Sequence, residues 1–192
     1  MGGNIANGSP IGDLAPALIA LAASVHLASA NGKRTVALES FFIDYGKQDI
    51  APGEIVASIS VPLNAHTDFH CWKISKRFDQ DISAVCGAFG LTIENNIITS
   101  ARIAFGGMAA TPRRATLCEQ ALIGQSVHRD LLSSASEALS KDFAPISDMR
   151  ASASYRIRAA QGLLERCLRS INGETTPQLF SDVEALEVPA RG

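Results

Sequence analysis

The feature that most constrains the fold is a pair of strand-like segments joined by two asparagines. Residues 82–94 and 97–105 are rich in apolar and β-branched residues, and Asn95 and Asn96 lie between them. Asparagine tolerates positive φ angles, so this pair favours a tight hairpin. A third strand is predicted just upstream, over residues 69–75. Three helical segments follow the hairpin, and strands followed by a run of helices indicate an α+β fold, here with a three-stranded antiparallel sheet.

The first two helical segments are predicted from their start signals. One is expected over residues 111–123, with Thr111 as its N-cap and Pro112 in its first position. Another is expected over residues 126–140, with Ser126 as its N-cap. These residue types mark helix starts because a side-chain oxygen can accept from amides that lack a partner inside the helix, whereas proline has no amide to satisfy.

The third helical segment is predicted to be the longest, with Ser147 or Asp148 as its N-cap and its end at Gly173. Apolar residues at helical spacing predict a buried stripe that contains Tyr155, Ala159, Leu163, Leu164, Cys167, Leu168 and Ile171. The opposite face is predicted to be polar and carries Arg156, Arg158, Glu165, Arg166 and Arg169. Residues 174–192 show little apolar periodicity and are expected to form a flexible tail.

The segment before residue 65 has a different pattern. Residues 1–12 are rich in Gly, Asn, Ser and Pro and predict a loop, and Asp13 is a natural N-cap for an Ala- and Leu-rich helix over residues 14–28. Short strands are expected over residues 34–38 and 54–62. A polar link near residues 64–68 then predicts a division into domains of residues 1–65 and 66–173, followed by the tail.

Composition excludes several classes of protein. The formal net charge is -2 and no basic or acidic run stands out, so no nucleic-acid or membrane partner is expected. The longest apolar stretch, residues 14–30, is too short and too polar to span a membrane and has no basic segment before it, so the expected location is the cytoplasm. No metal site is expected from the histidines and cysteines, and buried, reduced thiols are predicted at Cys71, Cys86, Cys118 and Cys167.

Three stretches are candidates for chemistry. The Gly- and Asn-rich residues 2–13 precede a helix, where backbone amides and the helix N-terminus suit a phosphate or an electron-rich ring edge. Taken alone, this pattern is more often an ordinary capped loop. Residues 73–83 concentrate mixed charges between two strands, and residues 105–115 contain paired glycines that favour close packing. Since no nucleophile is paired with a base, any reaction of this chain would need a cofactor.

Together and in order, these stretches resemble the molybdenum hydroxylases, specifically the FAD-bearing part of xanthine dehydrogenase. Residues 2–13 resemble the flavin loop of that family, and residues 73–83 resemble its K-x-x-x-R-x-x-x-D-I-[SA] segment. Residues 105–115 resemble its G-G-M-A-x-x-P-x-R-A segment, and residues 149–156 resemble the opening of its last helix, D-x-R-A-S-x-x-Y-R. The similarity spans about residues 2–171 and rests on four motifs in the family's order.

The resemblance implies a fold and an electron path. Residues 1–65 would form the C-terminal half of an FAD-binding domain of the vanillyl-alcohol-oxidase (PCMH) type, and residues 66–173 a domain like the C-terminal domain of CO dehydrogenase flavoproteins. Electrons would leave the substrate at a molybdenum cofactor, cross 2Fe-2S clusters, reach FAD and pass to NAD+. The molybdenum cofactor and the clusters would belong to partner subunits or domains, with no catalytic residue and no metal in this chain.

The resemblance also implies contacts to FAD, made by Gly3, Asn4, Ala6, Asn7, Ser9, Asp13, Val56 and Lys73. Asp13 would hold a polar part of FAD as well as cap its helix. Residues 75–81 would lie near the isoalloxazine ring, where they would influence the access of NAD+.

One departure from the family pattern concerns the start of the chain. Family members carry a further flavin-binding half upstream of the loop, whereas Met1 precedes Gly2 directly here. The chain is therefore expected to be a fragment whose complete FAD site needs that half, and to be inactive alone. The alternative is a catalytically inert module in which residues 69–171 pack against a partner subunit, motivated by the apolar stripe of the last helix.

Overall fold

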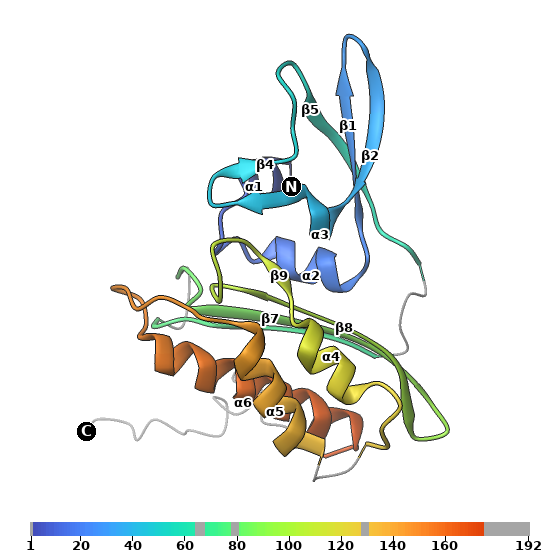
Figure 1. Cartoon of the computed structure of the whole chain (residues 1–192), viewed down its shortest axis with the longest axis vertical. Coiled ribbons are helices and arrows are strands. Elements are labelled where there is room, and N and C mark those ends of the chain that lie inside the picture. Colours follow the sequence, from blue (N-terminus) through green and yellow to red (C-terminus); the bar gives the residue numbers. More distant parts are fainter. Residues whose placement is uncertain (1, 64–67, 78–80, 128–130, 175–192) are drawn as a thin grey trace, which may run out of the picture.

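The computed structural model describes residues 2–63, 68–77, 81–127 and 131–174, and it consists of two regions that pack on each other (Figure 1). The first region contains residues 2–63. The second region is built on a four-stranded sheet, with helices below it and the first region above it in Figure 1. The predicted boundary residues 64–67 and the predicted tail residues 175–192 lie outside the described residues.

The sheet of the second region is antiparallel throughout. Its order is β6-β7-β8-β9, with β6 at Asp68–Ile74, β7 at Val85–Glu94, β8 at Ile97–Gly106 and β9 at Arg113–Arg114. Asn95 and Asn96 have φ angles of 51° and 63°, so the predicted hairpin between β7 and β8 is confirmed. The short strand β9 was not expected, and it makes the sheet four-stranded rather than three-stranded.

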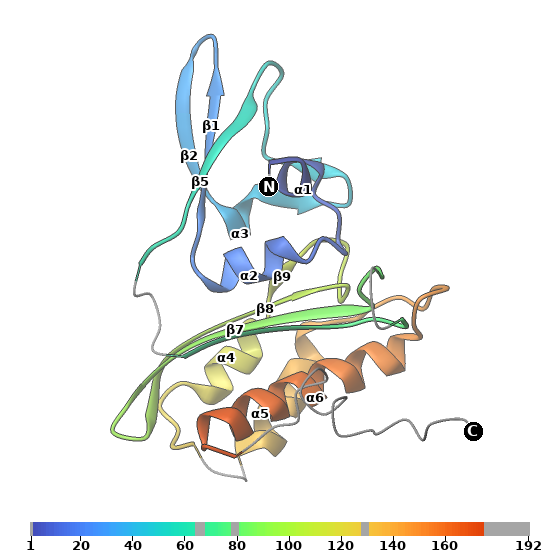
Figure 2. The same cartoon turned by 180° about the vertical axis from the view of Figure 1, so that it is seen from behind.

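Three helices cover one face of this sheet, as Figures 1 and 2 show from opposite sides. They are α4 at Thr116–Leu122, α5 at Leu131–Asp142 and α6 at Ala153–Ile171. Between sheet and helices lies an apolar core with three aromatic rings in edge-to-face contact, Phe89 on Phe105 and Phe105 on Phe143, each pair with centroids 5.6 Å apart. The predicted run of strands followed by helices is therefore confirmed, and the fold is α+β.

The opposite face of the sheet is lined by small residues and is covered by helix α2, Leu14–Ala20. Ala88 and Ala104 of the sheet are fully buried in the core of the first region. A Cβ atom on Gly106 would lie 3.1 Å from Pro16 of α2 and 3.3 Å from the carbonyl oxygen of Pro10. The close packing expected of the paired glycines is thus present, because only a residue without a side chain leaves room for α2 here.

The first region combines a three-stranded antiparallel sheet with short helices. The sheet has the order β2-β1-β5, with β1 at Ser24–Ser29, β2 at Gly32–Ala37 and β5 at Ile55–Ser60. Helix α1 covers Gly2–Asn7, α3 covers Leu38–Phe41, and a small hairpin consists of β3 at Phe42–Asp44 and β4 at Lys47–Gln48. Ile5, Leu27 and Phe41 are fully buried in the core that this region shares with the sheet below.

Two predictions for the first region were wrong. Residues 2–7 form helix α1 rather than a loop, and Ile5 is the buried residue of this helix. The helix predicted over residues 14–28 ends at Ala20, and the chain then forms strand β1. Ala22 has a φ of 56°, a conformation that glycine usually adopts at the residue after a helix. Because alanine occupies this position, no residue type signals that the helix ends here. Pairing of β1 with β2 and β5 overrides the helical propensity of the alanines.

The predicted starts of three helices were also wrong. Ser126, the predicted N-cap of the second helical segment, forms an isolated β-bridge with Ile97, and α5 covers Leu131–Asp142. Thr111 and Pro112 precede strand β9, and α4 begins at Thr116. The carboxylate of Asp142, at the end of α5, accepts from the amides of Leu117 and Cys118 at 3.0 and 2.9 Å, so a distant side chain caps α4. The N-cap of α6 is Ser152, whose hydroxyl accepts from the Tyr155 amide, rather than Ser147 or Asp148.

Helix α6 is the longest helix of the described residues, as predicted, but its buried face is rotated from the predicted one. Tyr155 is 43% exposed, whereas Arg156, assigned to the polar face, is only 2% exposed. Leu163, Leu164 and the residues one turn further are buried as expected. Arginine can enter the core here because several acceptors surround its guanidinium group, as shown below.

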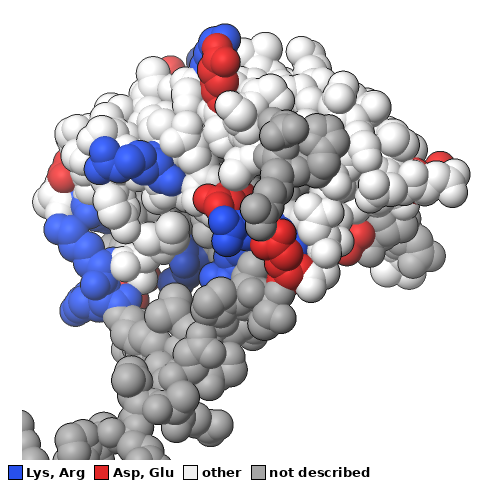
Figure 3. Space-filling model, turned by 90° about the horizontal axis from the view of Figure 1, so that it is seen from below, with Lys and Arg blue, Asp and Glu red and all other residues white. Residues whose placement is uncertain are grey.

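The helix-covered side of the molecule is shown in Figure 3, viewed from below. Lys and Arg side chains gather toward one side of this view, while acidic side chains lie among basic ones nearer its middle. Charged side chains are therefore unevenly distributed over this face.

A cavity between the loop before α2 and strand β7

A cavity of about 630 Å³ opens where the two regions meet. One wall is the loop that leads into α2, and the other is the short segment that precedes β7. The side chains and backbone that line it come from Asn4, Ser9, Ile11, Gly12, Asp13, Leu14, Ala17, Asp81, Ile82 and Ser83. Residues distant in the sequence therefore form one site, and the site exists only when both regions are packed together.

Asp13 is the central charged group of this cavity. Its Oδ1 accepts from the Ser83 hydroxyl at 2.5 Å, and its Oδ2 lies 3.2 Å from Nζ of Lys73. Lys73 Nζ also donates to the carbonyl oxygen of Asp81 at 3.1 Å. The Asp13 side chain makes no capping hydrogen bond to α2, so the expectation that it would cap this helix was wrong. The Asp13 carboxylate instead binds two side chains of the second region, Ser83 and Lys73.

The loop itself is held against the sheet. The carbonyl oxygen of Pro10 accepts from the Gly107 amide at 2.7 Å, and the Gly12 amide donates to the carbonyl oxygen of Ser9 at 3.1 Å. The Ser9 hydroxyl accepts weakly from the Ile11 amide at 3.4 Å. Because these bonds link the loop both internally and to the end of β8, the loop has a defined position at the cavity wall.

Asp81 lies in the wall formed by the segment before β7, and its carboxylate is bound by several donors. Its carboxylate accepts from the Arg77 amide at 2.9 Å, from the Ile82 amide at 2.9 Å and from the Arg77 guanidinium at 3.3 Å. The hydrogen bonds from the Arg77 amide and side chain lower the pKa of Asp81. The Asp81 carboxylate thus binds Arg77 and Ile82, while its backbone carbonyl accepts from Lys73, the ion-pair partner of Asp13.

The structure brings some of the predicted FAD contacts together and leaves others elsewhere. Asn4, Ser9 and Asp13 line the cavity, and Lys73 reaches it through its ion pair with Asp13. The remaining predicted residues are not among the lining residues: Gly3, Ala6 and Asn7 lie on α1, and Val56 lies on β5 against the core of the first region. Asn7 uses its carbonyl oxygen to accept from Gln48 at 3.3 Å.

Sequence reasoning did not single out Ser83, Asp81 or Ile82 as site residues. All three lie inside the charged stretch of residues 73–83, so the motif located the segment but not the contacts. The signal that could have identified Ser83 is its position two residues before a buried strand, where a hydroxyl side chain needs a partner.

A second cavity, of about 410 Å³, lies at the start of α6. Its lining residues are Ser75, Lys76, Ala84, Asp148, Met149, Arg150, Ala151, Ser152 and Tyr155. Lys76 Nζ donates to the carbonyl oxygen of Met149 at 2.6 Å, which connects the β6 end to the segment before α6. The two cavities therefore flank the same charged stretch, residues 73–83.

The buried Arg156 binds two of the residues that line this second cavity, Ala84 and Asp148. Its guanidinium donates to Asp148 at 2.7 Å, to the carbonyl oxygen of Gly107 at 2.9 Å and to the carbonyl oxygen of Ala84. Desolvation would raise the pKa of Asp148, but hydrogen bonds from the Ala151 and Arg150 amides and from Arg156 outweigh it and lower the pKa to about 2. Arg156 thus connects α6 to the residue before β7 and to the residue after β8.

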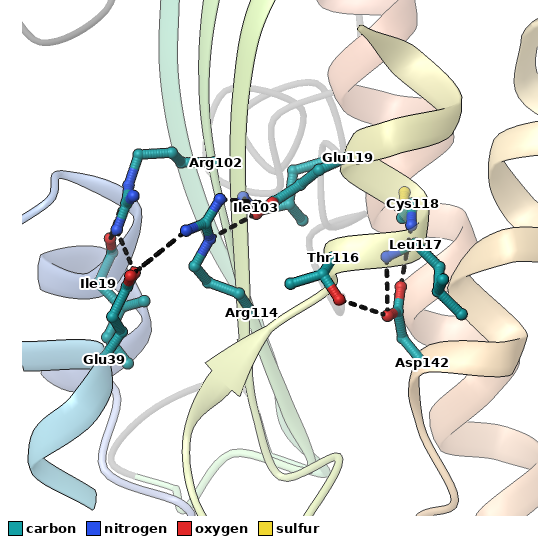
Figure 4. A network of polar contacts seen from close by, with 10 residues as sticks. All are labelled: Ile19, Glu39, Arg102, Ile103, Arg114, Thr116, Leu117, Cys118, Glu119 and Asp142. Atoms are coloured by element: carbon teal, nitrogen blue, oxygen red, sulfur yellow. Dashed lines mark hydrogen bonds and ion pairs between the residues drawn. The ribbon is translucent and has the colours of Figure 1, made fainter.

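A chain of charged residues connects the first region to the sheet some distance from the cavities (Figure 4). Glu39 of α3 accepts from Arg102 and from Arg114, and Arg114 also binds the buried Glu119 at 2.6 Å. Arg102 donates to the carbonyl oxygen of Ile19, at the end of α2, at 3.0 Å. Alternating charges of this kind stabilise the packing of α2 and α3 on the sheet.

The four cysteines are all free, but their environments differ from the prediction. Cys86, Cys118 and Cys167 are buried as expected, whereas Cys71 on the edge strand is exposed. Among the described residues, no group of three or more His, Cys, Asp or Glu side chains is arranged to bind a metal. No helix in the described part of the chain has the length and apolar character needed to cross a membrane.

An α+β domain stacked on part of a flavin-binding region defines the flavoprotein component of molybdenum hydroxylases. Residues 70–171 match the family described as the CO dehydrogenase flavoprotein C-terminal domain, and residues 1–64 match the FAD-binding domain in molybdopterin dehydrogenase. The chain belongs to this family of flavoproteins. The fold and the cofactor class expected from the four sequence motifs are thereby confirmed.

Individual relatives support the same assignment. The chain is 30% identical to the glyceraldehyde dehydrogenase medium chain of Sulfolobus acidocaldarius over 89% of its length. It is 29% identical to the xanthine dehydrogenase FAD-binding subunit of Escherichia coli O157:H7 over 87% of its length. It also resembles the structure of carbon monoxide dehydrogenase from Hydrogenophaga pseudoflava, with 27% identity, 91% coverage and a TM-score of 0.83. The chain spans 60%, 58% and 61% of these three relatives, respectively.

Proposed function

We propose that this chain is the FAD-carrying, electron-transfer part of a molybdenum hydroxylase that resembles xanthine dehydrogenase. The observation that carries this proposal is the cavity at which Asp13 binds Lys73 and Ser83. There the loop before α2, which resembles the flavin loop of the family, lies next to the charged stretch of residues 73–83. In the proposed division of the chain, residues 1–65 belong to the FAD-binding domain and residues 66–173 to the C-terminal domain.

The chemistry of the cavity fits part of an FAD molecule. Its volume of about 630 Å³ lies in the range of small-molecule sites. The ionised Asp13 carboxylate can only accept hydrogen bonds, so it suits ribityl or ribose hydroxyls and would repel a phosphate. Lys73 is a donor that suits the carbonyl and nitrogen acceptors of a flavin ring edge. Asn4 and Ser9 add donors and acceptors along the same wall.

Each predicted FAD contact has a proposed role in this arrangement. Asn4, Ser9, Asp13 and Lys73 would hold FAD within the cavity, while Gly3, Ala6, Asn7 and Val56 would contact it beyond the cavity. Bound FAD would supply the ability to accept electrons and to release them as a hydride. The protein's part is to bind and orient the flavin and to set the charge around it.

The proposed electron acceptor is NAD+, and the second cavity supports this assignment. Tyr155 and Met149 are exposed at its rim and offer apolar surface for a planar ring, while Lys76 and Arg150 place positive charge nearby for phosphates. The cavity shares the stretch of residues 73–83 with the proposed flavin site. The proposed electron donors are 2Fe-2S clusters and a molybdenum cofactor in partner subunits or domains, where the substrate would be oxidised.

The alternative is an inert interaction module, and it was motivated by the apolar stripe of the last helix. The apolar stripe of α6 packs into the core of its own domain, with Leu163, Leu164 and Cys167 buried against the sheet. A stripe that is already covered is not free to bind a partner subunit.

The test is a titration of the 192-residue chain with FAD, followed by thermal melting. A ligand that binds only the folded state must raise the melting temperature. We expect a saturable rise with FAD, no rise for Asp13→Ala, and an unchanged response for Ser134→Ala on α5. Because the chain spans only about 60% of its flavoprotein relatives, we expect weak binding, and gel filtration without added FAD should leave the chain colourless. No FAD-dependent shift would contradict the proposal.

A further inference from the structure

We propose that Ser83 is a positioning residue for the flavin site: its hydroxyl holds the Asp13 carboxylate toward the cavity and away from the amides of α2. This inference rests on the proposed function. Its basis is that Asp13 stands immediately before a helix yet leaves the helix without a side-chain cap.

Aspartate before a helix normally accepts from the second or third amide of that helix, which stabilises the helix start. Asp13 instead has helical backbone angles, φ -68° and ψ -23°, and its side chain makes no such bond. Pro16 occupies the third helical position and has no amide to offer. Of the two usual donors this leaves the Ala15 amide, which the Asp13 side chain does not bind, and positions where proteins break a local rule are often functional sites.

The partners that divert Asp13 are not equivalent. Ser83 is only 2% exposed and its hydroxyl donates to Oδ1 at 2.5 Å, whereas Lys73 is a half-exposed, flexible side chain 3.2 Å from Oδ2. A short bond from a buried donor to a carboxylate fixes a direction, while an exposed ammonium contributes mainly charge. Ser83 therefore determines where the carboxylate points.

The backbone around Ser83 is suited to this role. The next residue, Ala84, donates its amide to the carbonyl oxygen of Ile74 at 2.7 Å, and Cys86 Sγ lies 3.7 Å from the carbonyl oxygen of Asp13. The start of β7 is thus bound both to β6 and to the loop before α2. An ionised carboxylate has about four acceptor positions, so Asp13 keeps capacity for ligand hydroxyls after binding Ser83 and Lys73.

The experiment compares the full chain with Ser83→Ala, Ser83→Thr and the control Ser134→Ala, whose hydroxyl donates to a backbone carbonyl in α5. The first measurement is the carboxyl ¹³C resonance of Asp13 without FAD. The second is the FAD dependence of the melting temperature. We expect Ser83→Ala to move the Asp13 resonance and to weaken FAD binding about tenfold, as for loss of a hydrogen bond to a charged group.

The same variant should leave the melting temperature without FAD unchanged, because a methyl group fits the site and the half-exposed Asp13 can bind water. Ser83→Thr should restore both the resonance and the affinity. An unmoved resonance, or wild-type FAD affinity in Ser83→Ala, overturns the inference while leaving the proposed function intact. A fall in melting temperature without FAD that accounts for the lost affinity also overturns it. If the wild-type chain shows no FAD response, the proposed function fails and the inference fails with it.

Discussion

Glu39 in the first region and Arg114 in the second form an ion pair, with Oε2 and Nη1 3.3 Å apart, across the contact between the two regions (Figure 4). Both side chains are partly shielded from water, so their attraction is less screened than at the open surface. Since Arg102 binds the same carboxylate, Glu39 lies between two positive charges on the sheet. The pair therefore contributes to holding the first region on the second.

The first prediction concerns this carboxylate. Glu39→Gln leaves two guanidinium groups without their shared counter-charge, and we expect it to reduce the free energy of unfolding by about 1.5–3 kcal/mol. Urea denaturation followed by circular dichroism measures the change. The matched control is Glu137→Gln, which removes an exposed, solvent-screened pair with Lys141 on α5 and should lower stability much less. Equal effects of the two variants would contradict the prediction.

Asp148 should make the stability of the chain depend on acid pH. Its pKa is about 2 in the folded state against an ordinary value of 3.8, so its stabilising contribution is complete above about pH 4 and is lost as the pH falls toward 2. Asp148→Asn should remove that part of the pH dependence. It should also lower stability at pH 7 by roughly 2–3 kcal/mol, because the buried Arg156 loses its carboxylate partner.

Thermal melts of both proteins between pH 2 and 7 would measure these effects. Wild-type and Asp148→Asn curves that stay parallel through the acid range would show that Asp148 does not titrate as described. Glu54 shares the acid range, since hydrogen bonds from Arg34 and the Ala51 amide lower its pKa to about 2, so the variant should retain a residual slope.

Gly107 and Gly124 allow a clean comparison of crowding with backbone strain. Both have positive φ angles, 80° and 82°, but a Cβ on Gly107 would meet the Ala84 carbonyl oxygen at 2.3 Å, whereas a Cβ on Gly124 would meet nothing within 4 Å. Gly124→Ala should reduce the free energy of unfolding by about 1–2 kcal/mol from backbone strain alone. Gly107→Ala should reduce it by at least about 1 kcal/mol more, because the β8 end must shift. Chemical denaturation of the two variants decides this, and similar losses would refute the crowding.

The cysteines should differ in their reaction with thiol reagents. Cys71 is exposed and a hydrogen bond with the Cys86 side chain lowers its pKa, while burial raises the pKa of Cys118 and of Cys167. We expect one fast-reacting thiol in the native chain, absent in Cys71→Ser, with Cys118 and Cys167 reacting only on unfolding. Labelling with iodoacetamide and peptide mass spectrometry identifies the sites. Fast labelling of Cys167 in the native chain would contradict the assignment.

Parts of the structure whose contacts are local could be predicted from the sequence. The β7–β8 hairpin follows from Asn95 and Asn96, and the end of α6 near Gly173 follows from the left-handed conformation that glycine adopts there at φ 75°. Elements that depend on distant partners could not be predicted. Strand β1 directly follows an Ala-rich segment and was assigned to the same helix, because its two neighbouring strands are not visible in its own sequence.

The same division applies to the candidate site. The family resemblance implied that Asp13 and Lys73 belong to one site, and in the structure the Lys73 Nζ and Asp13 Oδ2 atoms are 3.2 Å apart. The direction of the Asp13 side chain could not be inferred, since helix-start chemistry favours a cap and only the packing of β7 on the loop supplies Ser83 as a stronger partner. Arg156 was likewise assigned to a polar face, although Asp148 and two carbonyl oxygens make its burial possible.

The sequence alone therefore determined the α+β class, the long hairpin, the last helix and the family, because these depend on short-range residue preferences and on motif order. The tertiary structure decided where the helix after Asp13 ends, which side chains cap α4 and α6, and how Asp13, Lys73 and Ser83 meet. The physical reason is that burial and hydrogen bonding between distant segments contribute more free energy than the local propensities with which they compete.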